Sequence, residues 1–254
     1  MAATILCFLT IVALRGNVLA GSRLTLVGFD GISVIIGFVA FVLGAVVFGP
    51  LFGMSLVISV LLHELGHVLA YQFLGYENVR FRFVPLFSGV PISDTPIRTE
   101  GHGFFIALMG PGICVAPMAL AYALSIVLQD VHPEAATIFR TFAVTCGTIN
   151  FINLLPFWPL DGGKCARIFA ANFWPALAPA LAVFMAAMFA TAAIRTQPLT
   201  LLIMAMVGAQ SIFHKAKPHP IPMGADNALI AMAAYSFTMA AHFSGGYWLL
   251  SQYM

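Results

Sequence analysis

Two histidines and a glutamate lie close together in a strongly apolar stretch of the sequence. His63, Glu64 and His67 belong to the segment SVLLHELGHVLAYQFLG, residues 59–75. Residues four apart on a helix lie about 40° apart around the axis and about 6 Å apart along it, so both imidazoles share one face. Two imidazole nitrogens at this separation can bind one Zn²⁺, and a glutamate beside them can accept a proton from water. The spacing therefore favours a zinc site with Glu64 as the general base.

A simpler interpretation is a hydrogen-bonded cluster of these three side chains that joins neighbouring helices. A carboxylate and two histidines buried in lipid without an ion would be energetically costly, however. A bound dication removes that cost, because it favours neutral imidazoles and an ionised carboxylate. Gly66 agrees with the metal interpretation, since a residue without a side chain lets another backbone approach closely.

A hydrolytic zinc site usually has three protein ligands and one open position for water, so a third ligand is needed. The segment NFINLLPFWPLDGGKCAR, residues 150–167, contains the main candidate, Asp161. Pro156 and Pro159 should interrupt a helix there, and the two glycines after Asp161 permit a tight turn. Broken helix at membrane depth is tolerated where it is buried in protein or lines a polar cavity. From the spacing alone, Asp161 is either the third ligand or the cap of a short helix that starts at Gly162.

The other candidate ligands have less support from their positions. The remaining histidines are weaker candidates: His102, His132, His214, His219 and His242. His242 lies inside the last apolar segment, where we expect it to make an ordinary hydrogen bond. The four cysteines stand singly in apolar surroundings, which predicts small core residues rather than disulfides or metal ligands.

The composition places these residues in a membrane protein. Of 254 residues, 61% are hydrophobic and 8% are charged, whereas a soluble domain has about 25% charged residues. A net charge of +2 without a basic run gives no indication of nucleic-acid binding. Segments apolar enough to form spanning helices follow one another along the chain, at 31–49, 51–74, 103–128, 141–163, 174–194, 198–213 and 227–250. We therefore expect an all-α polytopic membrane protein with about six to seven transmembrane helices.

The placement of lysine and arginine predicts the orientation in the membrane. If residues before 31 are cytoplasmic and the spans alternate, most basic residues face the cytoplasm, and the exceptions are Arg140 and Arg195. The spans at 51–74 and 141–163 then run parallel and end on the cytoplasmic side. We divide the chain into a membrane-associated N-terminal segment (1–30), a catalytic transmembrane core (31–172) and accessory C-terminal helices (173–254). Residues 1–21 lack a basic stretch before their apolar run, which favours a retained segment over a cleaved signal peptide.

The motifs resemble those of the site-2 proteases, a family of intramembrane zinc metalloproteases. HELGH at 63–67 looks like the family's zinc motif, and NLLPFWPLDGG at 153–163 looks like its second motif. MGPG at 109–112 and FVPLFSGVPI at 83–92 are similar to two further elements of the family. The resemblance covers roughly residues 51–172. Two departures are that no connection is long enough for a PDZ or CBS domain, and that the spans after residue 174 match no family motif.

The resemblance implies hydrolysis of a peptide bond in or near a transmembrane segment of another membrane protein, as in regulated intramembrane proteolysis. His63, His67 and Asp161 would bind one zinc ion per chain, Glu64 would be the general base, and Asn153 would help to bind or polarise the scissile region. The compact chain suggests a prokaryotic cell membrane with the active site toward the cytoplasm. A catalytically inert membrane relative, or an ion transporter that uses the same cluster, is the alternative.

An extended substrate needs new partners for its backbone, which an exposed strand edge can supply. VRFRFV at 79–84 alternates apolar and basic residues as a half-exposed strand would, and Gly89 to Pro91 indicate a turn. This pattern predicts a short β-hairpin near the active site. An interfacial loop whose arginines contact lipid phosphates is equally consistent with it.

Overall fold

The computed structural model describes residues 31–76, 95–156, 158–174, 176–196 and 221–253, with isolated positions within 4–12, at 79 and within 201–210. The main helices are α2 (Gly31–Phe48), α3 (Pro50–Phe73), α4 (Glu100–Leu128), α5 (Pro133–Asn153), α6 (Asp161–Phe173), α7 (Leu177–Thr196) and α9 (Ala225–Tyr253). Within these ranges the extended structure is an isolated bridge between Thr99 and Ile221. The expectation of a mostly helical protein is thus confirmed.

Among the described residues, 3 helices are long and apolar enough to cross a membrane: α3, α4 and α5. The chain is therefore an integral membrane protein by the length and composition of its helices. The number of spans, which the sequence puts at about six to seven, stays a prediction. The proposed hairpin, most of the N-terminal segment, His214 and His219 lie outside the described residues.

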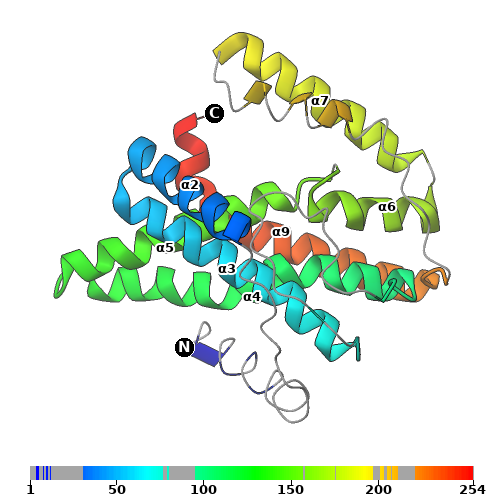
Figure 1. Ribbon diagram of the computed structural model, residues 1–254, viewed down its shortest axis with the longest axis horizontal. Coiled ribbons are helices and arrows are strands. Elements are labelled where there is room, and N and C mark those ends of the chain that lie inside the picture. The colour runs from blue at the N-terminus through cyan, green and yellow to red at the C-terminus, as the bar shows by residue number, and fades with distance from the viewer. Residues whose placement is uncertain are drawn as a thin grey trace.

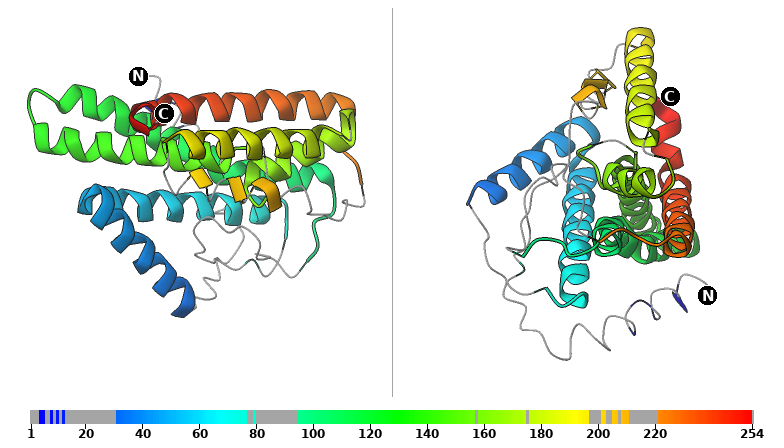
Figure 2. Two further views of the ribbon diagram at one scale, coloured as in Figure 1. Left: turned by 90° about the horizontal axis from the view of Figure 1, so that it is seen from above. Right: turned by 90° about the vertical axis from the view of Figure 1, so that its right-hand side faces the viewer.

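The centre of the molecule is formed by helices α3, α4, α5 and α9 (Figures 1 and 2). Helix α5 packs against α3, α4 and α9, and α4 also contacts α3, α6 and α9. Helix α2 packs against α3 and slants away from the other helices, as the left view of Figure 2 shows. Helix α7 lies at the edge of the molecule beside α6. The centre thus joins helices from both halves of the chain.

The start of α3 follows from two residues. Gly49 has φ of +97°, a region that favours glycine, and Pro50 occupies the first turn of α3, where its missing N–H costs nothing. The boundary between α2 and α3 agrees with the limits of the apolar segments 31–49 and 51–74. Helices α3 and α5 run in the same direction, because Phe52 and Thr137 line one pocket near their N-terminal ends while His63 meets Asn150 further along both.

The expected span at 141–163 is wrong in its position. Helix α5 begins at Pro133 and ends at Asn153, and α6 begins at Asp161; the described residues between them, 154–156 and 158–160, are not helical. Pro156 explains the stop, because it disfavours helix at the residue before it. The glycines after Asp161 do not form a turn but lie inside α6.

Glycines let α9 approach α5 closely. A Cβ added to Gly147 on α5 would lie 2.5 Å from the backbone nitrogen of Gly246 and 2.7 Å from the carbonyl carbon of Gly245. A Cβ added to Gly246 would lie 2.7 Å from the backbone nitrogen of Thr148. The two backbones therefore touch, which is how helices in membranes gain dispersion contacts where the hydrophobic effect offers little.

We expect Gly147→Ala to destabilise the protein, because the added methyl group must push α9 away. Overpacking of this kind costs about 1–3 kcal/mol. Gly101→Ala on α4 is the matched control, since its Cβ would meet Thr99 Oγ1 at an ordinary 3.7 Å. Thermal unfolding in detergent micelles should show a lower midpoint for the first variant alone. Equal midpoints would contradict the close contact between α5 and α9.

Candidate metal centre

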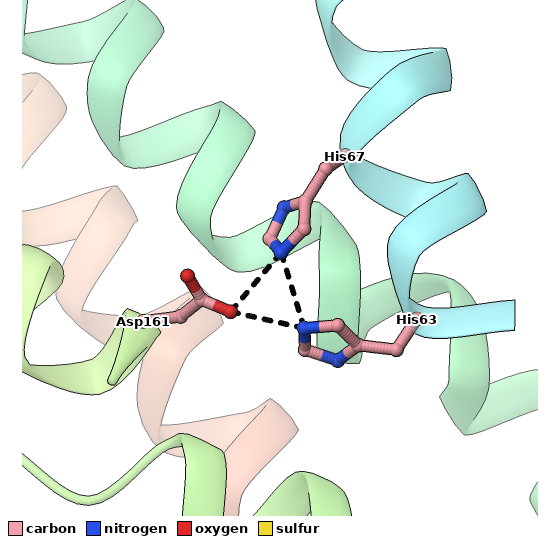
Figure 3. Close-up of side chains that lie close together, drawn as sticks. All are labelled: His63, His67 and Asp161. Carbon is pink, nitrogen blue, oxygen red and sulfur yellow. Dashed lines mark hydrogen bonds and ion pairs between the residues drawn. The ribbon is translucent and has the colours of Figure 1, made fainter. Parts of the chain in front are cut away.

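Helix α3 carries both histidines of the HELGH motif on one buried face. His63 is 5% exposed and His67 is 3% exposed. Their Nε2 atoms lie 3.1 Å apart (Figure 3). The predicted helical spacing therefore holds in the folded chain, and both imidazoles point at the same place.

Asp161, the first residue of α6, lies next to these two imidazoles although it is far from them in the sequence. Its Oδ2 lies 3.1 Å from Nε2 of His63 and 3.1 Å from Nε2 of His67. Asp161 is fully buried and is the first residue of α6, while Leu160 occupies the N-cap position. Figure 3 shows the carboxylate reaching the two imidazoles from α6, so its side chain serves the cluster rather than capping the helix.

The hydrogen bonds of the two imidazoles determine where their protons lie. His67 Nδ1 is 2.7 Å from the carbonyl oxygen of Ile106, which can only accept. His63 Nδ1 is 2.8 Å from Oδ1 of Asn150, whose Nδ2 donates to the carbonyl of Cys146. Each Nδ1 therefore donates a proton, and each neutral imidazole keeps the lone pair on Nε2.

The cluster consequently turns acceptor atoms toward one another. Two Nε2 lone pairs and a carboxylate oxygen repel each other at 3.1 Å in a buried place unless a positive charge lies among them. Ligands of tetrahedral zinc, at bonds of about 2.0–2.1 Å, lie about 3.3 Å apart. His63, His67 and Asp161 form a group that could hold a metal ion, and its chemistry fits zinc.

Two charged side chains lie beside this group. Glu64 follows His63 on α3, is buried, and is close enough to interact electrostatically with His63, Asp161 and Lys164. Lys164 Nζ donates to Oδ1 of Asp161 at 2.8 Å, one turn along α6. Asp161 thus has one oxygen for the cluster and the other held by an ammonium group.

Asn153, the last residue of α5, reaches the edge of the cluster. Its Nδ2 is 2.9 Å from Oδ2 of Asp161 and 2.9 Å from Nε2 of His63. The amide therefore points its donor at the centre of the cluster. The structure thus brings together all five residues that the sequence predicts for the site: His63, Glu64, His67, Asn153 and Asp161.

Backbone approaches by glycine make this convergence possible. A Cβ on Gly66 would lie 2.2 Å from the carbonyl oxygen of Met109, so the backbones of α3 and α4 are in contact there. This is the close backbone approach that the sequence predicted at Gly66. A Cβ on Gly162 would lie 1.9 Å from the carbonyl oxygen of Leu154, which brings the start of α6 against the end of α5. Both contacts position the elements that carry the ligands.

Helix α9 carries no recognised motif but contacts the segments that do. His242 is fully buried, and its Nε2 donates to the carbonyl of Pro111, next to Gly110 in the MGPG element. Tyr235 donates its hydroxyl proton to the carbonyl of Leu154, next to Asn153. The hydrogen bond expected for His242 is confirmed.

The other described histidines serve elsewhere. His102 Nδ1 is 3.0 Å from the hydroxyl of Tyr76, and His132 is exposed at the start of α5, the end opposite Asn153. Cys114, Cys146 and Cys165 are buried free thiols, as predicted.

The sequence interpretation missed three residues around the cluster: Gly110, Asn150 and Lys164. Asn150 had a visible signal, because it is a polar residue in an apolar helix, three positions before Asn153 and so on the same face. Lys164 lies one turn after Asp161 and could have been found in the same way. Gly110 belongs to the MGPG element, but the sequence did not indicate its role, since that role depends on a contact between two helices.

We expect Gly110→Ala to weaken zinc binding strongly. The new Cβ would lie 2.5 Å from Cε1 of His67 and 2.9 Å from Cε1 of His63, so both imidazoles must move. Gly112→Ala is the control on the same helix, because its Cβ would meet Met109 Sδ at 3.7 Å. The measurement is zinc per chain after purification in detergent. Equal zinc content in both variants would contradict the close approach of α4.

Comparisons with known proteins agree with the motifs. No family model matches the chain. It is 31% identical over 111 residues to Stage IV sporulation protein FB from Bacillus subtilis, a match that covers 44% of this chain and 37% of that protein. It is 35% identical over 118 residues to the putative zinc metalloprotease Rip3 from Mycobacterium tuberculosis, covering 45% of this chain and 29% of that protein.

The matches thus span about a third of the length of these curated relatives. A structural similarity with a TM-score of 0.47 and 17% identity links the chain to a solved site-2 protease from Methanocaldococcus jannaschii, over 73% of this chain and 90% of that one. Together with the motifs, the curated relatives confirm the resemblance of this chain to the site-2 proteases, a family of intramembrane zinc metalloproteases.

Proposed function

We propose that the chain is a zinc-dependent endopeptidase that cleaves a membrane protein within or near a transmembrane segment. The observation that supports this proposal most directly is the buried convergence of His63, His67 and Asp161, with the carboxylate of Glu64 beside it. The three converging residues would hold one zinc ion, and Glu64 would transfer protons as the general base.

Zinc bound there would supply a Lewis acid, which makes water nucleophilic near neutral pH and polarises a carbonyl group. Glu64 then acts as general base: it takes a proton from the attacking water and gives it to the nitrogen of the leaving amine. Because Glu64 does not belong to the converging group, its carboxylate remains free for this transfer.

Asn153 would hold the scissile carbonyl. Its Nδ2 already points at the centre of the cluster, 2.9 Å from Oδ2 of Asp161, and could donate to the carbonyl oxygen as negative charge develops there. Lys164 would keep the carboxylate of Asp161 in place through its bond to Oδ1. These two residues stabilise and orient without exchanging protons in the reaction.

The location of the site inside apolar helices supports a substrate that is itself a membrane protein. A transmembrane helix keeps its amides bonded internally, so the segment to be cut must unwind before it can reach the cluster. The bias of basic residues supports an active site toward the cytoplasmic side of the membrane. No nucleic acid enters this proposal.

We expect Glu64→Gln to abolish cleavage while zinc binding stays within a few-fold of wild type, because glutamine keeps the shape but cannot take a proton. Glu134→Gln, at an exposed position in the first turn of α5, is the matched control and should cleave normally. The assay follows cleavage of membrane-protein substrates in proteoliposomes, with zinc measured in the same samples. A fully active Glu64→Gln protein would exclude this glutamate as the base and with it the proposed protease mechanism.

Removal of the metal provides a separate test. We expect a strong chelator to stop cleavage and stoichiometric zinc to restore it, with one zinc ion bound per chain. Magnesium should not restore cleavage, because two imidazoles and one carboxylate suit zinc better than a cation that prefers oxygen ligands. Cleavage that persists in the metal-free protein would contradict the proposal.

A further inference from the structure

Asn150 contacts one of the candidate zinc ligands from behind. It is fully buried on α5, and its Oδ1 lies 2.8 Å from Nδ1 of His63, the ring nitrogen that faces away from the cluster. The motif resemblance assigns no role to this residue. Its position one turn before Asn153 puts both amides on the same face of α5, one behind the ligand and one in front of it.

The amide of Asn150 is fixed in one orientation. Its Nδ2 donates to the carbonyl of Cys146 at 2.9 Å and lies 3.5 Å from the Sγ atom of the same residue. A carbonyl oxygen accepts and cannot donate, so the NH₂ group must face Cys146 and Oδ1 must face His63. Cys146 is itself fully buried, which leaves this contact dry and the hydrogen bond strong.

The two histidines are therefore oriented by different means. His67 donates to a main-chain carbonyl, that of Ile106, which no substitution of a side chain can remove. His63 donates to a side chain. An acceptor at Nδ1 places the proton there, leaves the lone pair on Nε2, and holds the ring plane toward Asp161 at 3.1 Å.

We propose that Asn150 is a positioning residue for the metal centre: its amide oxygen fixes the tautomer and the ring orientation of His63 and thereby raises the affinity for zinc. This inference rests on the proposed function, because it takes the cluster as a zinc site. A role in helix packing alone would need the volume of Asn150 but not its acceptor oxygen. The two roles therefore predict different results for variants that change one property at a time.

Three variants of the full chain, purified in detergent, separate acceptor from volume. Asn150→Leu keeps approximately the volume and removes the acceptor, Asn150→Ala removes both, and Asn150→Asp keeps an acceptor oxygen. Thr148→Val is the matched control, a near-isosteric change at a buried position on α5 that only weakly bonds Gly246, at 3.4 Å. Zinc affinity is measured by competition with a chelator, cobalt substitution reports the ligand field by visible absorption, and thermal unfolding checks that each variant folds.

We expect Asn150→Leu and Asn150→Ala both to bind zinc about 10–100-fold more weakly than wild type, the usual effect of losing an outer partner of a ligand. The cobalt spectra of these two variants should be altered. Asn150→Asp should bind zinc at least as tightly as wild type. The control Thr148→Val should bind zinc within a few-fold of wild type. If the leucine and alanine variants do not fold, Asn150→Asp decides alone, and weaker binding by it would overturn the inference.

Wild-type affinity and spectrum in Asn150→Leu would overturn the positioning role and leave the proposed protease intact. An equal loss in Thr148→Val and Asn150→Leu, or a loss in Asn150→Asp as large as that in Asn150→Leu, would assign the effect to packing and overturn it too. A wild-type chain that binds no zinc would instead refute the proposed function, so the two failures are distinguishable.

Discussion

Three acceptor atoms face one another in the dry centre of the helices, and the surrounding structure is arranged to hold them there. Nε2 of His63, Nε2 of His67 and Oδ2 of Asp161 lie 3.1 Å from one another. Without a cation, their lone pairs would repel in a buried place where little solvent can screen them. A divalent ion bound among the three atoms would compensate this repulsion. The protons on the Nδ1 atoms, the ammonium of Lys164 and the donor of Asn153 all suit that one requirement.

The helices reach this arrangement through contacts between backbones. Gly66 lets α3 lie against the carbonyl of Met109, Gly110 leaves room for both imidazoles, and Gly162 brings α6 against the carbonyl of Leu154. A methyl group added at any of these three glycines would collide with the atoms that face it. In a membrane, where lipid is as apolar as the side chains, such close approaches also supply much of the packing energy. The glycines therefore serve stability and the geometry of the site together.

Helix α9 extends the site beyond the segments that carry motifs. His242 bonds the carbonyl of Pro111 and Tyr235 bonds the carbonyl of Leu154, so one helix near the end of the chain contacts both α4 and the end of α5 beside the cluster. The close contact of Gly147 with Gly245 and Gly246 fixes its height along α5. The division into a core and accessory helices stays a prediction, yet α9 packs as part of the wall around the site.

The sequence by itself determined the class of the protein and the identity of the chemical groups. Hydrophobic content indicated a helical membrane protein, the i, i+4 spacing put His63 and His67 on one face, and Pro156 predicted the break before Asp161. These features depend on local periodicity and on residue chemistry, which a linear sequence records. Only the tertiary structure decided that Asp161 meets both imidazoles, that Asn150 lies behind His63, and that Gly110 must lack a side chain. Each of these depends on the distance between residues far apart in the chain, and that distance is set by how the helices pack.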